Sequence, residues 1–146
     1  LAVTLAVGLI EREEGIGCQQ AYNPQAALFG QSIREMSNII ELVGGGHENI
    51  VYGAGDLYVT IFGGRTRKLG TLLGRGLSFD EAMAKLEGIT LESVVITTRI
   101  ARALYRLEKA GLVNMKDFPL LVHINDIINN RALVEIPWKE FQSQAL

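Results

Sequence analysis

Apolar residues recur with helical spacing along most of the chain. Over residues 26–43 they fall three or four positions apart, which is the period of an amphipathic α-helix. Asn23 is a suitable cap for this helix, and Pro24 is a suitable first residue. The glycines at 44–46 stop the pattern, because glycine readily ends a helix. The sequence therefore predicts a long helix that starts after Asn23.

Other segments are helical by the same criterion. Residues 1–12 are nearly all apolar, which predicts a helix that is buried on most sides. Ser78 and Glu81 have the spacing of a capping box, and we expect the short helix that they open to close at Gly88. Three more helices are expected. One covers residues 97–110, the second starts at residues 117–119 and ends at residues 129–130, and the third covers residues 137–141.

Evidence for β-strands is thin. Residues 94–98 are rich in β-branched side chains, but they form a lone run among helical segments. We therefore expect an all-α fold of six to eight helices. With 146 residues and neither an internal repeat nor a linker, the chain has the size of a single domain that spans residues 1–146.

Composition argues against several classes of protein. The net charge of −2 leaves no basic excess for binding nucleic acid. Cys18 is the single cysteine and cannot form an internal disulfide, so nothing indicates an oxidising compartment. Residues 1–10 are apolar but too short to span a bilayer, and no cysteine, histidine or carboxylate spacing matches a metal site. We expect a cytoplasmic protein without a nucleic-acid, membrane or metal partner, and read Leu1 as a starting point inside a longer chain.

Glycines concentrate between residues 44 and 76, where they predict turns and close backbone approaches rather than uninterrupted helix. If residues 56–61 are helical, Asp56 and Thr60 share a face. Together with Arg65, they have the chemistry of a site for a small phosphorylated molecule, since arginine binds phosphate through paired donors. Alternatively, Asp56 caps a helix and the basic residues form a solvated face. The residue pattern alone leaves both interpretations open.

Residues 53–68 resemble the signature of NAD-dependent glycerol-3-phosphate dehydrogenases. They read Gly-Ala-Gly-Asp-Leu-Tyr-Val-Thr-Ile-Phe-Gly-Gly-Arg-Thr-Arg-Lys. Three further motifs of the family have counterparts here, in the same order along the chain. They are residues 15–17 followed by 23–28, residues 74–82, and residues 111–113 followed by 118–120. The resemblance implies a multi-helix C-terminal domain of the 6-phosphogluconate-dehydrogenase-like type, with an N-terminal Rossmann domain that this chain lacks.

The resemblance also implies a reaction and a set of roles. The family interconverts dihydroxyacetone phosphate and sn-glycerol 3-phosphate with NAD or NADP, which the Rossmann domain mainly binds. Asp56 matches the catalytic aspartate beside a proton-transferring lysine, and Thr60 matches a threonine of the substrate site. Arg65 and Thr66 match the pair that holds the substrate phosphate, with Arg65 also close to the cofactor. Members commonly form homodimers through this helical domain.

Three departures from the family pattern mark the chain as a divergent member. Thr66 stands where the family has asparagine, which weakens or replaces one phosphate contact. Ser93 follows Glu92 where the family has glycine, in a loop that closes over the cofactor. The family's lysine aligns either immediately before Leu1 or at Ala2, and neither alignment gives a lysine in this chain. Either the chain is a fragment that begins just after the lysine, which we expect, or this member lacks it.

Two alternatives remain open beside the dehydrogenase. One is a phosphate-binding or regulatory module that has lost hydride chemistry, as the departures would allow. The other is a relative of ketopantoate or 6-phosphogluconate reductases. This interpretation fits the expected fold and cofactor, but it does not explain the motif at residues 53–68.

Overall fold

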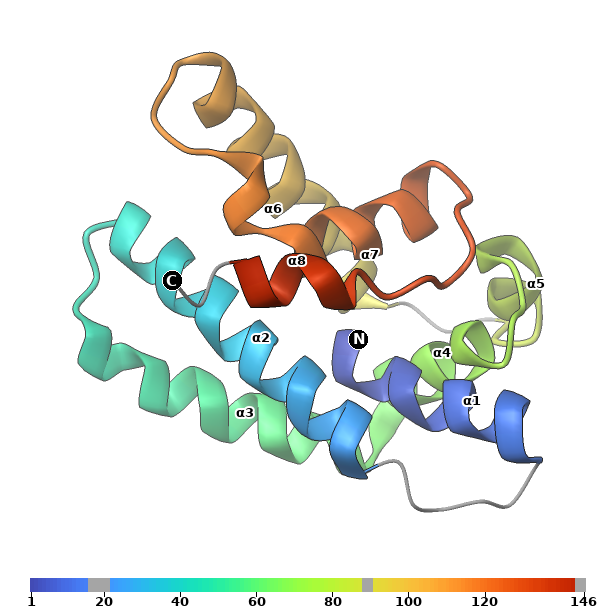
Figure 1. Cartoon of the computed structure of the whole chain (residues 1–146). Coiled ribbons are helices and arrows are strands. Elements are labelled where there is room, and N and C mark those ends of the chain that lie inside the picture. Colours follow the sequence, from blue (N-terminus) through green and yellow to red (C-terminus); the bar gives the residue numbers. More distant parts are fainter. Residues whose placement is uncertain (16–21, 88–90, 144–146) are drawn as a thin grey trace.

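The computed structural model describes residues 1–15, 22–87 and 91–143, and every regular element in these ranges is a helix. Figure 1 shows how the elements are arranged. Their bounds are α1 (Ala2–Glu14), α2 (Tyr22–Leu42), η1 (His47–Asn49), α3 (Ile50–Phe62), α4 (Gly64–Gly74), α5 (Phe79–Ala84), α6 (Glu92–Lys109), η2 (Met115–Asp117), α7 (Pro119–Asn129) and α8 (Trp138–Ser143). None of these helices is long and apolar enough to cross a membrane.

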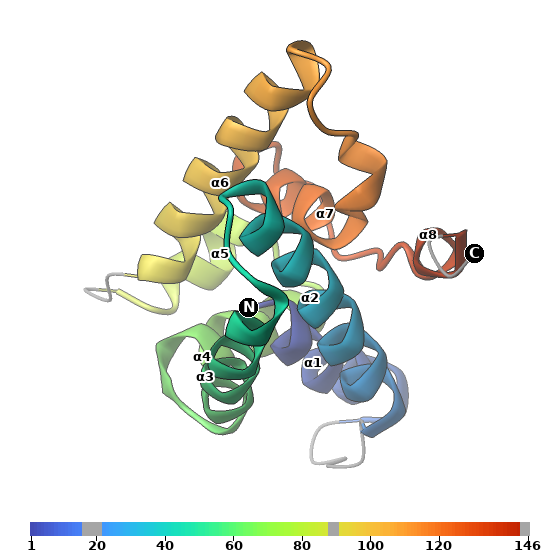
Figure 2. The ribbon, with the colours of Figure 1, turned by 90° about the vertical axis from the view of Figure 1, so that its left-hand side faces the viewer.

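The helices form two groups, and their buried residues make a larger hydrophobic core and a smaller cluster around Leu104, Met115 and Phe118. Helices α1 and α4 pack side by side, and α2 and α3 form a second pair next to them (Figure 1). Helices α6 and α7 form a hairpin that stands above these four helices (Figure 2). The largest fully buried side chains come mainly from α1, α2, α4 and α7, and include Leu5, Leu28, Leu69, Leu73 and Ile127.

Helices α1 and α4 approach each other at glycines. A Cβ atom on Gly8 would lie 2.7 Å from the backbone nitrogen of Arg75 and 2.8 Å from the carbonyl carbon of Gly74. A Cβ atom on Gly74 would lie 2.9 Å from the Cα atom of Gly8. These distances are below normal contact, so the helices meet backbone to backbone. At the end of this contact Arg75 donates from Nε to Oε2 of Glu11 at 2.6 Å.

A buried carboxylate joins α2 to α7. Glu35 is 5% exposed, and its two oxygens accept the backbone N–H groups of Leu120 and Leu121 at 2.7 and 2.8 Å. Gln31, one turn earlier on α2, also donates to Glu35 at 2.8 Å. The carboxylate therefore satisfies the first turn of α7, where helix N–H groups lack partners within the helix. Burial raises the pKa of Glu35, although these hydrogen bonds oppose the shift.

Most of the predicted elements are confirmed. The all-α fold is confirmed, and the described residues form eight α-helices, within the expected range of six to eight. Ser78 and Glu81 form the capping box: the serine hydroxyl accepts from the Glu81 N–H, and the glutamate accepts from the Ser78 N–H. Helix α7 begins and ends where its sequence indicates, with Pro119 in its first turn. Helix α2 ends at Leu42, just before Gly44 turns the backbone at φ +77°.

Other predictions are wrong. Tyr22 and Asn23 are already helical, so Asn23 is inside α2 rather than its cap. The β-branched residues 94–98 lie within α6, which starts at Glu92 instead of near residue 97. Glycines at 53, 55, 70 and 74 also lie in helices despite their low helix propensity. Gly70 and Gly74 are buried against α1, whereas Gly55 is exposed and has no neighbouring atom within 4 Å. Cys18, Gly88 and the family-like residues 16–17 lie outside the described residues.

The glycine contact predicts opposite effects for two alanine substitutions. Gly8→Ala places a methyl group against the α4 backbone, which cannot move aside, so we expect a loss of about 1–3 kcal/mol or more in unfolding free energy. Gly30→Ala on α2 meets no atom within 4 Å. It is therefore expected to stabilise the chain by about 0.4–1 kcal/mol. Urea unfolding of both variants tests this, and equal effects would contradict the close approach.

Glu35 predicts a specific dependence of stability on pH. Since its pKa in the folded chain lies above the ordinary value of 4.5, protonation favours the fold. The stabilisation that Glu35 contributes to the fold is thus complete below pH 4.5, and it is lost as the pH rises through the pKa of Glu35 in the folded chain. We expect the unfolding free energy of the wild type, measured relative to Glu35→Gln, to fall as the pH rises from about 4.5. The exposed Glu41→Gln, on the same helix, is the control. A flat or rising difference for Glu35→Gln would refute the raised pKa.

Candidate functional site

The candidate site is built around the turn between α3 and α4. Gly63 is extended, whereas Gly64 has φ +86°, a conformation that favours glycine. A Cβ atom on either residue would meet nothing within 4 Å, so the backbone is open to an approaching molecule here. Helix α4 starts at this turn and has no side-chain cap. The N–H groups of its first turn therefore form a positive end that favours an anion.

Asp56 and Thr60 share one side of α3, as their spacing predicts. The Thr60 hydroxyl donates to the backbone carbonyl of Asp56 at 2.9 Å, which leaves the Asp56 carboxylate out of this bond. Asp56 is exposed, and Thr60 is half-buried. Asp56 lies in the middle of the helix, so the alternative role as a helix cap is wrong.

The basic segment that follows divides into separate roles. Arg67 turns back and donates to the carbonyl of Phe62 at 2.6 Å, so it fastens the C-terminal end of α3 to α4. Arg65 and Lys68 are exposed on α4, with Arg65 in the first turn. Arg65 therefore lies next to the open N-terminus of the helix, where an anion would be bound. The sequence pattern did not distinguish Arg67 from Arg65.

Thr66 and Ser93 meet across two helices. The Thr66 hydroxyl on α4 donates to the Ser93 hydroxyl on α6 at 3.1 Å, and both residues are half-buried. This hydrogen bond joins residues that are 27 positions apart in the chain. The two departures from the family pattern are therefore a single contact, and the first turns of α4 and α6 lie side by side.

Glu92 opens α6 beside this contact. It is exposed in the first turn, where a carboxylate interacts favourably with the positive end of the helix. Leu91 precedes it as a buried N-cap residue without a side-chain hydrogen bond. Glu92 and Ser93 thus belong to a helix, not to a loop, so their position is fixed by the packing of α6.

A hollow of about 190 Å³ lies where α1, α2, α3, α6 and α7 converge. Leu1, at the start of α1, borders it together with Leu57, the neighbour of Asp56, and Thr97 on α6. Glu35 also lines this hollow. Glu35 was not among the residues predicted from the sequence, although it stands one helical turn from Gln31 and two from Leu28, on the stripe of α2 that is buried.

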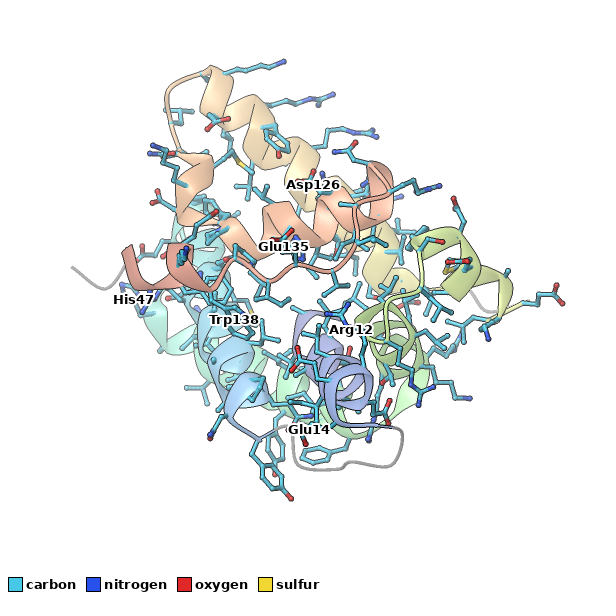
Figure 3. The ribbon with its side chains drawn as sticks, turned by 45° about the vertical axis from the view of Figure 1, so that its right-hand side comes forward. Arg12, Glu14, His47, Asp126, Glu135 and Trp138 are labelled. Atoms are coloured by element: carbon cyan, nitrogen blue, oxygen red, sulfur yellow. The ribbon has the colours of Figure 1, made fainter. Side chains whose placement is uncertain are left out.

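The histidines have structural roles. His123 Nε2 accepts the backbone N–H of Glu135, which is labelled in Figure 3, at 3.1 Å, and burial lowers the pKa of His123. His47 is exposed and pairs with Glu41. Over the described ranges, no three histidine, cysteine or acidic side chains are grouped so as to hold a metal ion.

Taken together, the site offers an exposed arginine and open N–H groups at the start of α4, two linked hydroxyls, and carboxylates at Asp56 and Glu92. The arginine and the N–H groups at the start of α4 can bind a small phosphate by charge and hydrogen bonds. The carboxylates can accept hydrogen bonds from hydroxyl or amide groups of a ligand.

Comparison with known proteins gives a consistent result. The family described as "NAD-dependent glycerol-3-phosphate dehydrogenase C-terminus" matches residues 2–138. The NADP(+)-dependent glycerol-3-phosphate dehydrogenase of Archaeoglobus fulgidus is 38% identical over 106 residues, which cover 71% of this chain and 31% of that protein. The glycerol-3-phosphate dehydrogenase [NAD(P)+] of Clostridium tetani is 33% identical over 117 residues, covering 77% and 31% respectively.

A third relative, the glycerol-3-phosphate dehydrogenase [NAD(P)+] of Xanthomonas campestris pv. campestris strain B100, is 33% identical over 85% of this chain and 35% of its own length. The chain thus spans about a third of the length of the curated relatives that it matches. No solved structure gives a significant match. The chain belongs to the NAD-dependent glycerol-3-phosphate dehydrogenase family and corresponds to its C-terminal region.

Proposed function

We propose that this chain is the substrate-binding and dimerisation domain of an oxidoreductase that interconverts dihydroxyacetone phosphate and sn-glycerol 3-phosphate with NAD or NADP. The relatives are glycerol-3-phosphate dehydrogenases that depend on NADP(+) or on NAD(P)+, which supports the substrate and the cofactor class. The observation that carries the proposal is the junction of α4 and α6, where Arg65, open backbone N–H groups and the Thr66–Ser93 bond come together.

The substrate phosphate is held at the start of α4 in this proposal. Arg65 supplies charge and paired N–H donors, and the first-turn N–H groups of α4 add hydrogen bonds. The Thr66 hydroxyl donates to Ser93, so it offers the phosphate less than an asparagine amide would. Thr60 lines the path from this phosphate to Asp56, four residues earlier on α3.

Asp56 has the catalytic role in this arrangement. The reaction adds hydride to the carbonyl carbon and a proton to its oxygen, or reverses both steps. Asp56 accepts hydrogen bonds beside the group that moves this proton, for which the family resemblance indicates a lysine just before Leu1. Leu1 and Leu57 border the same hollow, which supports a meeting of these two elements at the reacting atoms.

The first turn of α6 faces the cofactor in this proposal. Arg65, the Glu92 carboxylate and the Ser93 hydroxyl fit the hydroxyl and amide groups of a nicotinamide cofactor, because all three are polar and at least partly exposed. The cofactor, when bound, supplies or accepts the hydride. Most of its binding belongs to a Rossmann domain outside residues 1–146.

We expect Arg65→Ala in the complete dehydrogenase to raise the KM for the phosphorylated substrate and to lower kcat. A hydrogen bond to a charged group contributes about 1.5–3 kcal/mol, so kcat/KM should fall by about tenfold to a hundredfold. Lys139→Ala removes an exposed charge on α8 and serves as the control. Unchanged kinetics for Arg65→Ala would exclude the phosphate role.

The same measurements separate the alternative function. A binding or regulatory module that has lost hydride chemistry is favoured by one observation, the engagement of Thr66 with Ser93 in place of a phosphate contact. The complete protein would then bind sn-glycerol 3-phosphate in calorimetry without turnover with either cofactor. Turnover with NAD or NADP would reject this alternative.

A cytoplasmic homodimer is also proposed. Helix α3 carries large apolar side chains that are mostly exposed in the single chain, at Val51, Tyr52, Val59 and Phe62. A second copy that covers this face would remove them from water, which favours association. Light scattering should therefore give the mass of a dimer for the wild type and a lower mass for a Tyr52→Ser, Val59→Ser variant. The mass of a monomer for the wild type would contradict the proposal.

A further inference from the structure

A basic groove lies between α6 and α7, away from the candidate site. Arg102, Arg106 and Lys109 line it from α6, where their spacing of four and three residues sets them on one face. Asn125 and Asn129 line it from α7. The groove has a volume of about 410 Å³. In Figure 3, long side chains with nitrogen ends project from α6.

Arg102, Arg106 and Lys109 form no ion pair within the described part of the chain. The ion pairs found there involve other cations, namely His47, Arg75 and Arg131. Two nearby carboxylates, Asp126 and Glu108, form hydrogen bonds with neutral donors and no ion pair with the groove's cations. Asp126, labelled in Figure 3, accepts from the Asn130 amide at 2.7 Å, and Glu108 accepts the backbone N–H of Met115 at 3.0 Å.

Helix stability alone does not account for this cluster. Cations in the last turn of a helix interact favourably with its negative end, which explains Arg106 and Lys109. Arg102 lies outside the last turn and gains little from this effect. It also stands four residues before Arg106, a like-charge spacing that costs about 0.2–0.5 kcal/mol. The cluster therefore carries an electrostatic cost that a bound anion would remove.

The groove also offers uncharged donors. Asn129 donates to Asn125 Oδ1 at 2.9 Å and to the Thr98 hydroxyl at 3.2 Å, so the Asn125 amide nitrogen is turned away from this bond. Tyr105 borders the groove, and burial together with Asp126 and Glu108 raises its pKa, which keeps its hydroxyl proton in place. Amide and hydroxyl donors beside guanidinium groups match the oxygens of phosphate.

We propose that this groove binds a small anion with two or more phosphate groups. Residues 102 to 109 extend about 10 Å along the helix, so their long, flexible side chains can converge from both ends on a chain of linked phosphates. Arginine favours phosphate through bidentate hydrogen bonds. The site is separate from the junction at Ser93, since nine residues of α6 place Arg102 about 14 Å further along the helix.

Calorimetric titration of the 146-residue chain with inorganic tripolyphosphate at low ionic strength tests the proposal. We expect saturable binding that weakens at least tenfold in the double variant Arg102→Gln, Arg106→Gln. Arg99→Gln, an exposed arginine on the same helix outside the groove lining, is the matched control and should change the affinity less than twofold. Circular dichroism checks that each variant keeps its helices.

Two further titrations test where the anion binds and whether phosphate chemistry is required. Arg65→Ala removes binding at the candidate substrate site and should leave intact the part of the tripolyphosphate binding that the double variant loses, because Arg65 does not line the groove. A hexaglutamate peptide should bind more weakly than tripolyphosphate. The proposal is overturned by absence of binding, by equal losses in Arg99→Gln and the double variant, by loss of all binding in Arg65→Ala alone, or by equal affinity for the peptide. These results are independent of whether Arg65 serves catalysis.

Discussion

The architecture depends on the contact between α1 and α4, where two helix backbones meet with no side chain between them. Gly8 and Gly74 make this possible, because any larger residue would collide with backbone atoms that cannot rotate away. The contact sets the direction of α4 and thereby the place where its N-terminus opens at Gly63 and Gly64. The ion pair of Arg75 and Glu11 lies at the far end of the same contact.

A second anchor acts through Glu35. By accepting two backbone N–H groups of α7, it ties the α6–α7 hairpin to α2. Since α6 packs on α7, this bond helps to determine where Ser93 stands relative to Thr66. The candidate site is thus assembled from the ends of two helices whose positions are set by buried contacts elsewhere. Few of its residues touch one another directly.

The meeting of Thr66 and Ser93 changes how the divergence of this chain is understood. Each residue on its own is a departure from the family pattern. In the structure they are partners in one hydrogen bond, so the smaller side chain at 66 is accompanied by a hydroxyl from α6. This hydrogen bond lies at the phosphate end of the proposed site.

The sequence by itself determined the fold class, the C-terminal end of α2, both ends of α7, the capping box at Ser78 and the family, because these depend on local periodicity, turn residues and motif spacing. It failed at the start of α6, which begins at Glu92 instead of near residue 97, and at the glycines that stay within helices where α1 and α4 need a close approach. Only the tertiary structure decided that Arg67 closes α3, that Glu35 holds α7, and that Thr66 meets Ser93. Each of these contacts joins separate elements, so no local pattern records it.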